Sequence, residues 1–331
     1  MHAIVCREPG GVEVMSWEQV PDPTPRAHEV VIEVAAVGLN RADLLQRKGF
    51  YPPPAGASDY LGLECSGHIT AVGSGVTQWS IGDEVCALLT GGGCADFVAV
   101  PEGQVLPVPA GVSLIDAAAL PEIAATVWSN LALLAHLHAD EVLLIHGGTS
   151  GIGTMAIQIG SLLGATVIVT CGSDAKVAAA LSLGAHHAIN YRTANFVDEV
   201  QALTDGHGAD VIVDVMGAKY LDGNVRTLAV NGRLVVIGLQ GGTKGELDLN
   251  RLLTKRAAVL ATSLRQRPED EKAAIVASVR EHLWPLIESG DIRVVIDSYF
   301  PLHDIAQAHE RMESSEHIGK IVLTHAQSTT A

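Results

Sequence analysis

The stretch that decides the fold is VLLIHGGTSGIG, residues Val142–Gly153. Its apolar first half predicts a buried strand, Glu141–His146, that runs into a glycine-rich turn and then a helix over about Gly151–Leu163. Glycines let a backbone approach a pyrophosphate, and a helix N-terminus offers free N–H groups and the positive end of a dipole. The spacing is Gly147-x-x-Ser150-x-x-Gly153 rather than Gly-x-Gly-x-x-Gly, so the strand–turn–helix context carries the prediction.

This turn predicts a dinucleotide-binding site; the alternative is a turn that packs the helix on the strand and binds nothing. The predicted contacts are Gly147, Ser150, Gly151, Ile152 and Gly153. Further elements of the same kind follow along the chain. The expected strands are Thr166–Cys171, Val211–Val215 and Leu234–Ile237, with a helix over Asp174–Leu183. Strands that alternate with helices predict βαβ units, a parallel sheet and right-handed crossovers.

The residues after the strand Thr166–Cys171 bear on which dinucleotide binds. NAD enzymes usually place an acid there, about 20 residues beyond the turn, to bond the ribose 2′-OH. Here no acid ends the strand, and Ser173, Lys176 and Tyr191 offer the donors and cation that a 2′-phosphate needs. Asp174 is interpreted as a first-turn helix acid, and Lys176 could instead be an ordinary surface lysine. We therefore predict NADPH rather than NADH. The predicted cofactor contacts also include two glycines that follow strands, Gly172 and Gly238.

The first third of the chain has a different residue pattern. Pro and Gly clusters separate short runs rich in Val and Ile, and such spacing suggests a β-sandwich or barrel. The expected strands are Met1–Cys6, Val12–Trp17, Glu29–Val37, His68–Val72, Asp83–Leu88 and Cys94–Val100. The expected helices outside the alternating region are Arg41–Gln46, one or two within Ile115–His138, Glu269–Ser289 with a kink at Pro285, and Ile305–Met312. A last strand is expected over Lys320–Leu323.

Composition limits the class of protein. Among 331 residues, Lys and Arg number 21 against 37 Asp and Glu, which gives a net charge of −16. A chain this acidic lacks the electrostatic footprint of a nucleic-acid binder and argues against an anionic membrane as partner. Its five cysteines form no C-x-x-C pair, and the N-terminus shows no secretion signal. We therefore expect a cytoplasmic protein.

Several stretches together resemble one family. They are Val37–Asp43, Gly62–Gly67, Ile81–Val85, Ala118–Glu122, the glycine turn and Gly319–Val322. On these residues the chain resembles the medium-chain dehydrogenase/reductase superfamily, in its zinc-independent NADPH quinone oxidoreductase branch. The resemblance implies an α/β protein with a GroES-like, partly open β-barrel domain and a Rossmann domain with a doubly wound parallel sheet. It places the substrate domain at residues 1–121 and 296–331, and the cofactor domain at 122–295.

The resemblance also addresses metal binding. The zinc-dependent relatives supply a Cys ligand where this chain has Asn40, and a His where it has Leu63. Glu64 alone cannot hold Zn²⁺, and Cys94 is solitary where those relatives carry a four-cysteine lobe. We therefore predict no metal site.

The family pattern implies further site residues. Asn40, Asp43 and Tyr51 resemble residues that line the reaction site, Thr126 resembles a residue that faces the nicotinamide, and Lys320 resembles a lysine that reaches the cofactor. Each also has an ordinary structural interpretation. Asn40 could cap a helix, Asp43 could be an exposed helix acid, and Lys320 a strand-edge lysine. Tyr51 and Thr126 could be packing residues.

The predicted reaction is NADPH-dependent reduction of a quinone by direct hydride transfer in the interdomain cleft. An ordinary ketone yields an alkoxide that needs a Lewis acid or a proton donor, whereas a quinone yields an anion stabilised by aromaticity. One alternative is an enone or enoyl-thioester reductase, in which Tyr51 donates a proton. The other is a non-catalytic NADPH-binding sensor or structural protein. The expected partner in each enzyme case is a small electrophilic acceptor.

The run Ala257–Ser263 predicts a homodimer. It is an apolar, β-prone segment expected at the edge of the parallel sheet. An exposed edge of this kind favours pairing with another strand, and two-fold symmetry is the commonest way to close it. The alternative is that a helix or loop of the same chain covers it.

Overall fold

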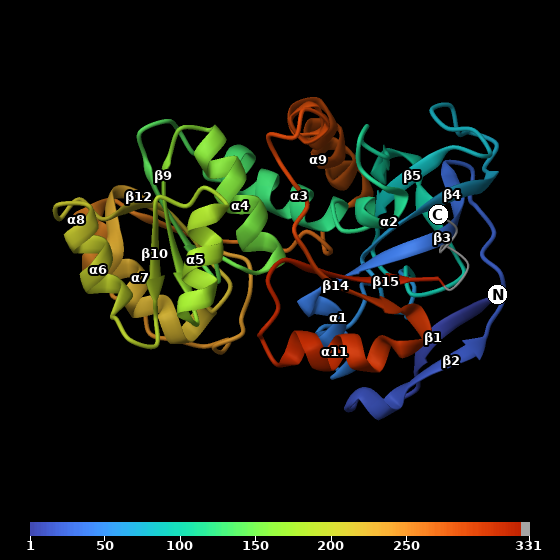
Figure 1. Ribbon diagram of the computed structural model, residues 1–331, viewed down its shortest axis with the longest axis horizontal. Helices are drawn as coiled ribbons and strands as arrows, with labels where there is room; N and C mark the ends of the chain where they lie inside the picture. The colour runs from blue at the N-terminus through green and yellow to red at the C-terminus, as the bar shows by residue number, and fades with distance from the viewer. Residues whose placement is uncertain (326–331) are drawn as a thin grey trace. The chain divides into compact units, whose positions relative to one another are not determined.

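The computed structural model describes residues 1–325, and the last six residues of the predicted C-terminal segment 296–331 lie outside it (Figure 1). The chain divides into two compact units, Met1–Ala125 with the residues from Leu264 onward, and Thr126–Ser263. The domains predicted from the sequence put residues 264–295 in the second unit. They group with the first because Trp284 Nε1 donates to the Pro107 carbonyl at 2.8 Å and helix α9 (Glu269–His282) packs beside residues 102–104.

The first unit is built around one long strand, β3 (Glu29–Leu39). β4 pairs antiparallel along one side of it, while β6 and β15 share the other side. The described strands of this sheet run β14-β15-β3-β4-β5-β7, with β6 added on β3. Their bounds are β4 Glu64–Val72, β5 Glu84–Leu88, β6 Phe97–Pro101, β7 Val105–Pro107, β14 Ile296–Pro301 and β15 Lys320–Thr324. A separate antiparallel pair is β1 (His2–Cys6) with β2 (Met15–Gln19). This is the expected GroES-like barrel. Most of its buried aliphatic side chains form one core, and Ala36 and Val322 belong to a smaller cluster on the side of α2 (Leu114–Ala117).

Short helices connect the strands of this unit. Their bounds are α1 Arg41–Arg47, α2 Leu114–Ala117, α3 Pro121–Trp128, α10 Trp284–Glu288 and α11 Ile305–Glu313. The predicted long helix 269–289 is two helices, α9 and α10, with Pro285 in the first turn of α10, where its missing N–H costs nothing. The predicted strand Val12–Trp17 begins instead with a 3₁₀ turn, Val12–Val14.

The second unit contains a fully parallel sheet in the order β10-β9-β8-β11-β12-β13. The strands are β8 Val142–His146, β9 Thr166–Cys171, β10 His187–Asn190, β11 Ala209–Asp214, β12 Leu228–Val236 and β13 Ala258–Ala261. In sequence rank this is the order 3-2-1-4-5-6 of a doubly wound Rossmann sheet. The direction of winding reverses between β8 and β11, and such folds bind ligands at the carboxyl ends of the strands there.

Helices cover both faces of this sheet (Figure 1). They are α4 Gly151–Leu162, α5 Asp174–Ser182, α6 Phe196–Leu203, α7 Leu221–Thr227 and α8 Leu249–Lys255. The buried strand residues Leu144, Ile168, Ile212 and Leu234 form the core beneath α6 to α8. Thr126 lies in α3, and a π-helical segment, Ser129–Leu134, continues the chain from that helix. Among the described residues, no helix is long and apolar enough to cross a membrane.

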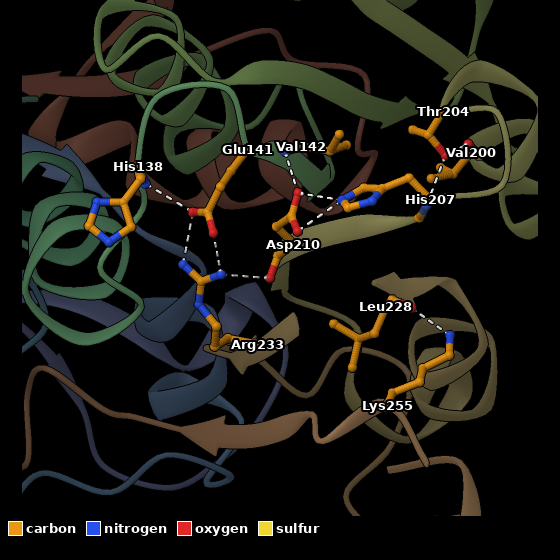
Figure 2. Close-up of polar contacts among 11 residues, drawn as sticks. His138, Glu141, Val142, Val200, Thr204, His207, Asp210, Leu228, Arg233 and Lys255 are labelled. Carbon is orange, nitrogen blue, oxygen red and sulfur yellow. Dashed lines mark hydrogen bonds and ion pairs between the residues drawn. The ribbon is translucent and has the colours of Figure 1, made fainter. Parts of the chain in front are cut away.

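Ion pairs close the amino end of the parallel sheet (Figure 2). Arg233 of β12 makes two hydrogen bonds to Glu141, at 2.7 and 2.9 Å, and also donates to the Asp210 carbonyl. The Asp210 carboxylate accepts from the backbone N–H of Val142 at 2.8 Å and faces His207. At the amino end of the sheet, the charges of Arg233 and Glu141 therefore pair with each other, and the Val142 N–H bonds to Asp210.

Candidate functional site

The glycine turn after β8 is held by one serine. Ser150 is the N-cap of α4: its Oγ accepts from the Gly153 N–H at 3.0 Å and donates to the Gly147 carbonyl at 2.9 Å. The first N–H groups of a helix have no partner within the helix. The cap uses that of Gly153, so the amides of Gly151 and Ile152 remain the natural contacts for a phosphate.

Glycine is required at two positions of this turn. Gly147 has φ +75°, in the left-handed region. A Cβ on Gly153 would lie 2.3 Å from the Gly147 carbonyl oxygen. The turn can therefore keep this conformation only without side chains here, which fits the close approach of a pyrophosphate that the sequence predicts.

The predicted 2′-phosphate residues gather at the end of β9. Gly172 is close to the Tyr191 hydroxyl, because a Cβ on Gly172 would lie 2.5 Å from that oxygen. Ser173 caps α5 by accepting from the Lys176 N–H at 3.3 Å, which places the lysine in the first turn of that helix. Asp174 is exposed and accepts from Asn190 Nδ2 at 2.7 Å. A hydroxyl, a phenol and an ammonium therefore lie on consecutive elements at this corner of the sheet.

The sequence analysis missed an aromatic and amide cluster beside the turn. His146, the last residue of β8, is fully buried; its Nε2 lies 2.7 Å from Asn224 Oδ1, and its Nδ1 lies 3.1 Å from Thr170 Oγ1. The rings of Phe196 and Tyr220 each lie 4.8 Å from its ring. Burial lowers the pKa of His146 to about 4, so the ring is neutral. The available signal was position, because His146 ends one strand and Tyr220 follows another at the carboxyl end of the sheet.

Asp214 ends β11 on the other side of the reversal point. Its carboxylate accepts from the N–H groups of Met216 and Gly217, at 2.7 and 2.9 Å. Burial nevertheless raises its pKa to about 6. Gly238 follows β12 nearby, and a Cβ there would lie 2.8 Å from the Val215 carbonyl oxygen.

Thr126, another predicted cofactor contact, lies in α3, and its carbonyl accepts from Asn130 Nδ2 at 2.8 Å.

Three of the predicted residues in the first unit form one buried cluster with Glu64, which we call the Lys320 cluster: Asn40, Asp43, Glu64 and Lys320. The Lys320 ammonium lies 2.6 Å from Glu64 Oε1 and donates to Asn40 Oδ1 and the Leu39 carbonyl, both at 2.8 Å. Asn40 Nδ2 donates to Glu64 Oε1 at 2.9 Å. Lys320 is only 3% exposed, and each of its three hydrogens has a partner inside the first unit. This placement gives Lys320 a structural role, and its cofactor contact stays a prediction.

Asp43 is also buried within this cluster, at 0% exposure, so it is not an exposed helix acid. Its carboxylate accepts from the N–H groups of Asn40 and Gly62, at 2.8 and 2.9 Å. Burial raises the pKa of Asp43, and the two backbone hydrogen bonds and Lys320 oppose that rise. Asn40 is the N-cap residue of α1, as the helix-capping alternative expected. The Asp43 carboxylate accepts from the backbone N–H of Asn40 and so fixes the start of this helix.

Tyr51 lies beside an arginine that the sequence analysis did not single out. The Arg265 guanidinium carbon is 5.3 Å from the centre of the Tyr51 ring, and Nη1 donates to the Tyr51 carbonyl at 3.3 Å. Nothing in the local sequence marks Arg265, because it comes 214 residues later in the chain.

The positions of the two missing zinc ligands can now be described. Leu63 is buried, at 2% exposure, and Asn40 is engaged by Glu64 and Lys320. The positive charge beside the Glu64 carboxylate is the ammonium of Lys320. Within residues 1–325, no three His, Cys, Asp or Glu side chains are grouped so that they could hold a metal ion.

Comparison with known proteins places this arrangement in a family. Residues 26–110 match the family described as alcohol dehydrogenase GroES-like domain, and residues 151–280 match zinc-binding dehydrogenase. Quinone oxidoreductase of Rattus norvegicus is 31% identical over 98% of this chain and 97% of its own length. The chain belongs to the medium-chain dehydrogenase/reductase superfamily.

Other relatives are larger proteins, and the chain spans only 14% or 15% of the length of several of them. One is the mycocerosic acid synthase-like polyketide synthase of Mycolicibacterium smegmatis, which is 31% identical over 97% of this chain and 15% of its own length. Among solved structures, quinone oxidoreductase of Escherichia coli complexed with NADPH has a TM-score of 0.86 and 28% identity, covering 98% of this chain and 100% of that one. The CurK enoyl reductase has a TM-score of 0.85 and 30% identity, covering 98% and 99%.

Proposed function

We propose that this protein is an oxidoreductase that uses NADPH to reduce quinones by direct hydride transfer without a metal. The observation that carries the proposal is the Lys320 cluster. In it Asn40 stands where zinc-dependent relatives have a ligand, as does Leu63 next to Glu64 in the chain, and the Glu64 carboxylate is paired with an ammonium at 2.6 Å. A polarising Lewis acid has no ligand set at that position. An acceptor whose reduced form is stable by itself suits such a site.

Residues of the second unit would hold the cofactor. The amides of Gly151 and Ile152 suit its pyrophosphate, while Ser173, Lys176 and Tyr191 suit a 2′-phosphate. When bound, the reduced nicotinamide supplies a hydride. A quinone that accepts a hydride at a carbonyl oxygen becomes the hydroquinone monoanion, whose aromatic ring spreads the charge on the second oxygen. The chain then needs to bind, orient and exclude water more than to donate a proton.

Tyr51 is the residue we assign to the acceptor. Its backbone is held by Arg265, which fixes the loop that carries it. Its phenol can orient a quinone carbonyl by a hydrogen bond. It can also return a proton to the hydroquinone anion, directly or through water.

A second candidate function is reduction of an enone or an enoyl thioester. It is favoured by the similarity to the CurK enoyl reductase. The TM-score of that structure is 0.85, against 0.86 for the quinone oxidoreductase of Escherichia coli. This chemistry adds a hydride at the β-carbon and a proton at the α-carbon, so it requires the Tyr51 proton. Tyr51→Phe should therefore abolish enone turnover and lower quinone turnover less.

The deciding experiment is an acceptor panel. Oxidation of NADPH and of NADH is followed with a set of quinones and with a crotonyl thioester. Turnover of quinones with NADPH supports the main proposal, and turnover of the thioester alone supports the alternative. Tight NADPH binding without turnover of any acceptor would instead favour a non-catalytic sensor or structural protein.

We also propose that the protein is a homodimer paired through β13, with its partner a second copy rather than nucleic acid or a membrane. Among residues 1–325, β13 pairs only with β12, and Val259 and Leu260 are half-buried. Pairing across a two-fold axis would satisfy this edge. Light scattering should give twice 34.6 kDa. Leu260→Pro, which removes a ladder N–H, should give monomers. A wild-type mass near 34.6 kDa would reject the dimer.

A further inference from the structure

The first unit contains a cavity of about 510 Å³. It is lined by residues 54–58, by Thr90 to Gly92 after β5, and by residues 265–272 at the start of α9. Its volume lies within the range of small-molecule sites, about 300–1,000 Å³. The comparisons with known proteins assign nothing to it.

The charges around this cavity oppose the charge of the whole chain. Four cationic side chains line it, Arg26, Arg265, Arg267 and Lys272, against two carboxylates, Glu29 and Glu269. The chain as a whole has a net charge of −16. Two of the cations are already compensated, because Arg26 pairs with Glu29 and Arg267 with Glu271, each at 2.9 Å. Arg265 and Lys272 remain.

Within the described part of the chain, these two cations are buried without an ion pair. Arg265 is 3% exposed; its Nε donates to the Thr90 carbonyl at 2.8 Å, while its buried Nη2 has no hydrogen-bond partner among the described residues. Lys272 is 5% exposed and donates to Thr90 Oγ1 at 2.8 Å. Burial lowers the pKa of both groups, although Asp43, Glu122 and Glu269 nearby partly oppose this.

A buried guanidinium nitrogen without an acceptor is costly and calls for an explanation. An anion bound in the cavity would supply the missing acceptor. A carboxylate or phosphate accepts from a guanidinium and an ammonium in short, charge-assisted hydrogen bonds, and it brings the missing counter-charge. Both cations meet at Thr90, through its carbonyl and its hydroxyl, so one anion can contact both.

We propose that this cavity binds a carboxylate or phosphate group through Arg265 and Lys272. Because Arg265 also donates to the Tyr51 carbonyl, the anion site adjoins the loop assigned to the acceptor. The acceptor therefore carries an acidic arm, an inference that rests on the proposed function. The binding of the anion itself does not.

The first test measures binding alone. Thermal unfolding of the full chain is followed with inorganic phosphate or benzoate at constant ionic strength, with chloride as the balancing salt. A ligand that binds only the folded state raises the unfolding midpoint with its concentration. We expect this rise for at least one of the two probes. Because the phosphate contacts proposed in the second unit would also bind phosphate, only a rise that Arg265→Met removes supports the cavity, and the probe that gives it tells a phosphate site from a carboxylate site. Equal midpoints in phosphate, benzoate and chloride would overturn the proposal.

Variants locate the site. Arg265→Met should weaken binding at least tenfold, as loss of a charged hydrogen bond does. Lys272→Gln keeps a donor for Thr90 and should weaken it by about tenfold for the same reason. Arg267→Met is the matched control: it lines the same cavity, but its charge is paired with Glu271, so the effect should stay below about threefold. If Arg265→Met does not fold, Arg265→Lys with Lys272→Gln decides, and wild-type affinity in both would overturn the proposal.

The second test concerns the acceptor. A benzoquinone with a propionic acid arm is compared with its methyl ester, which has the same ring without the charge. The wild type should show a KM at least tenfold lower for the acid, and Arg265→Lys should reduce that preference. Equal KM values with intact quinone turnover would overturn the acidic-arm assignment and leave the quinone proposal standing. Anion binding without turnover of either compound would overturn the quinone proposal and the acidic-arm assignment that rests on it, and would leave the anion site standing.

Discussion

The Lys320 cluster of the first unit and the glycine turn of the second are both rich in polar groups, but they use them differently. In the cluster, the ammonium, carboxylates and amide bond to one another, and Glu64, Asp43 and Lys320 are all nearly inaccessible. In the turn, one serine caps the helix and the first backbone amides remain for a ligand. A polar cluster with internal partners supports the fold, whereas donors left over by the fold form a binding site. The following predictions test this distinction.

The largest effect is expected in the cluster. Lys320→Met leaves the Glu64 carboxylate buried without its counter-charge, which should lower the free energy of unfolding by about 3–5 kcal/mol. Urea denaturation measures this loss. Adding Glu64→Gln removes the isolated charge and should restore part of the stability. A loss below about 1 kcal/mol in the single variant would show that the pair does not support the fold.

Gly153→Ala tests the turn. Its Cβ would lie 2.3 Å from the Gly147 carbonyl oxygen, so the turn must shift, and we expect NADPH affinity to fall by about a hundredfold or roughly 2.7 kcal/mol. Gly160→Ala is the control, since it lies in the same helix but meets the Leu143 side chain at 2.6 Å. It should change stability while affinity stays within about twofold. Equal losses of affinity in both variants would contradict a specific role for the turn.

His146 gives the site end of the sheet a pH dependence. Its pKa is about 4 in the folded protein against an ordinary 6.5, so the unfolded state binds the proton more readily. The stability it contributes is present above pH 6.5 and is lost as the pH falls toward 4. Between pH 7 and pH 5 the loss should be about 2 kcal/mol.

His146→Gln removes this titration. Burial also lowers the pKa of His309, to about 3, and this group acts in the same direction in both proteins. The measured quantity is therefore the difference between wild type and variant in urea unfolding at the two pH values. If both proteins lose the same stability, His146 is not the titrating group.

The smallest effect concerns the choice of cofactor. Lys176→Ala should raise KM for NADPH about tenfold, or about 1.5 kcal/mol, and leave KM for NADH nearly unchanged, because only NADPH carries the 2′-phosphate. Arg251→Ala is a control, since this exposed arginine pairs with Asp248 in α8. Equal changes with both cofactors would reject the assignment of Lys176.

The sequence analysis succeeded where a signal was local. The strand, turn and helix over residues 142–163 were predicted within one or two residues, because their apolar period, glycines and N-cap serine are adjacent in the chain. The alternation of strands and helices predicted the parallel sheet. The edge position of β13 also followed, since its segment comes after the other strands of the sheet.

It failed where partners are distant in the sequence. Lys320 and Asn40 are separated by 280 positions, so a short motif could not show that the lysine bonds to Asn40 and Glu64. Arg265 was missed for the same reason, as was the pairing of His146 with Asn224. Residues 264–295 were assigned to the second unit, although α9 and α10 look the same in sequence whichever unit they pack on.

The sequence by itself therefore determined the periodicity, the glycine positions, the chain's acidity and the replacement of two zinc ligands by Asn40 and Leu63. Only the tertiary structure decided which polar groups are satisfied by the protein. Backbone conformation is set largely by neighbouring residues, so glycines and caps can be identified along the chain. Desolvation and pairing depend on residues brought together from far apart, and they separate Lys320, with three partners, from Arg265, whose Nη2 has none among the described residues.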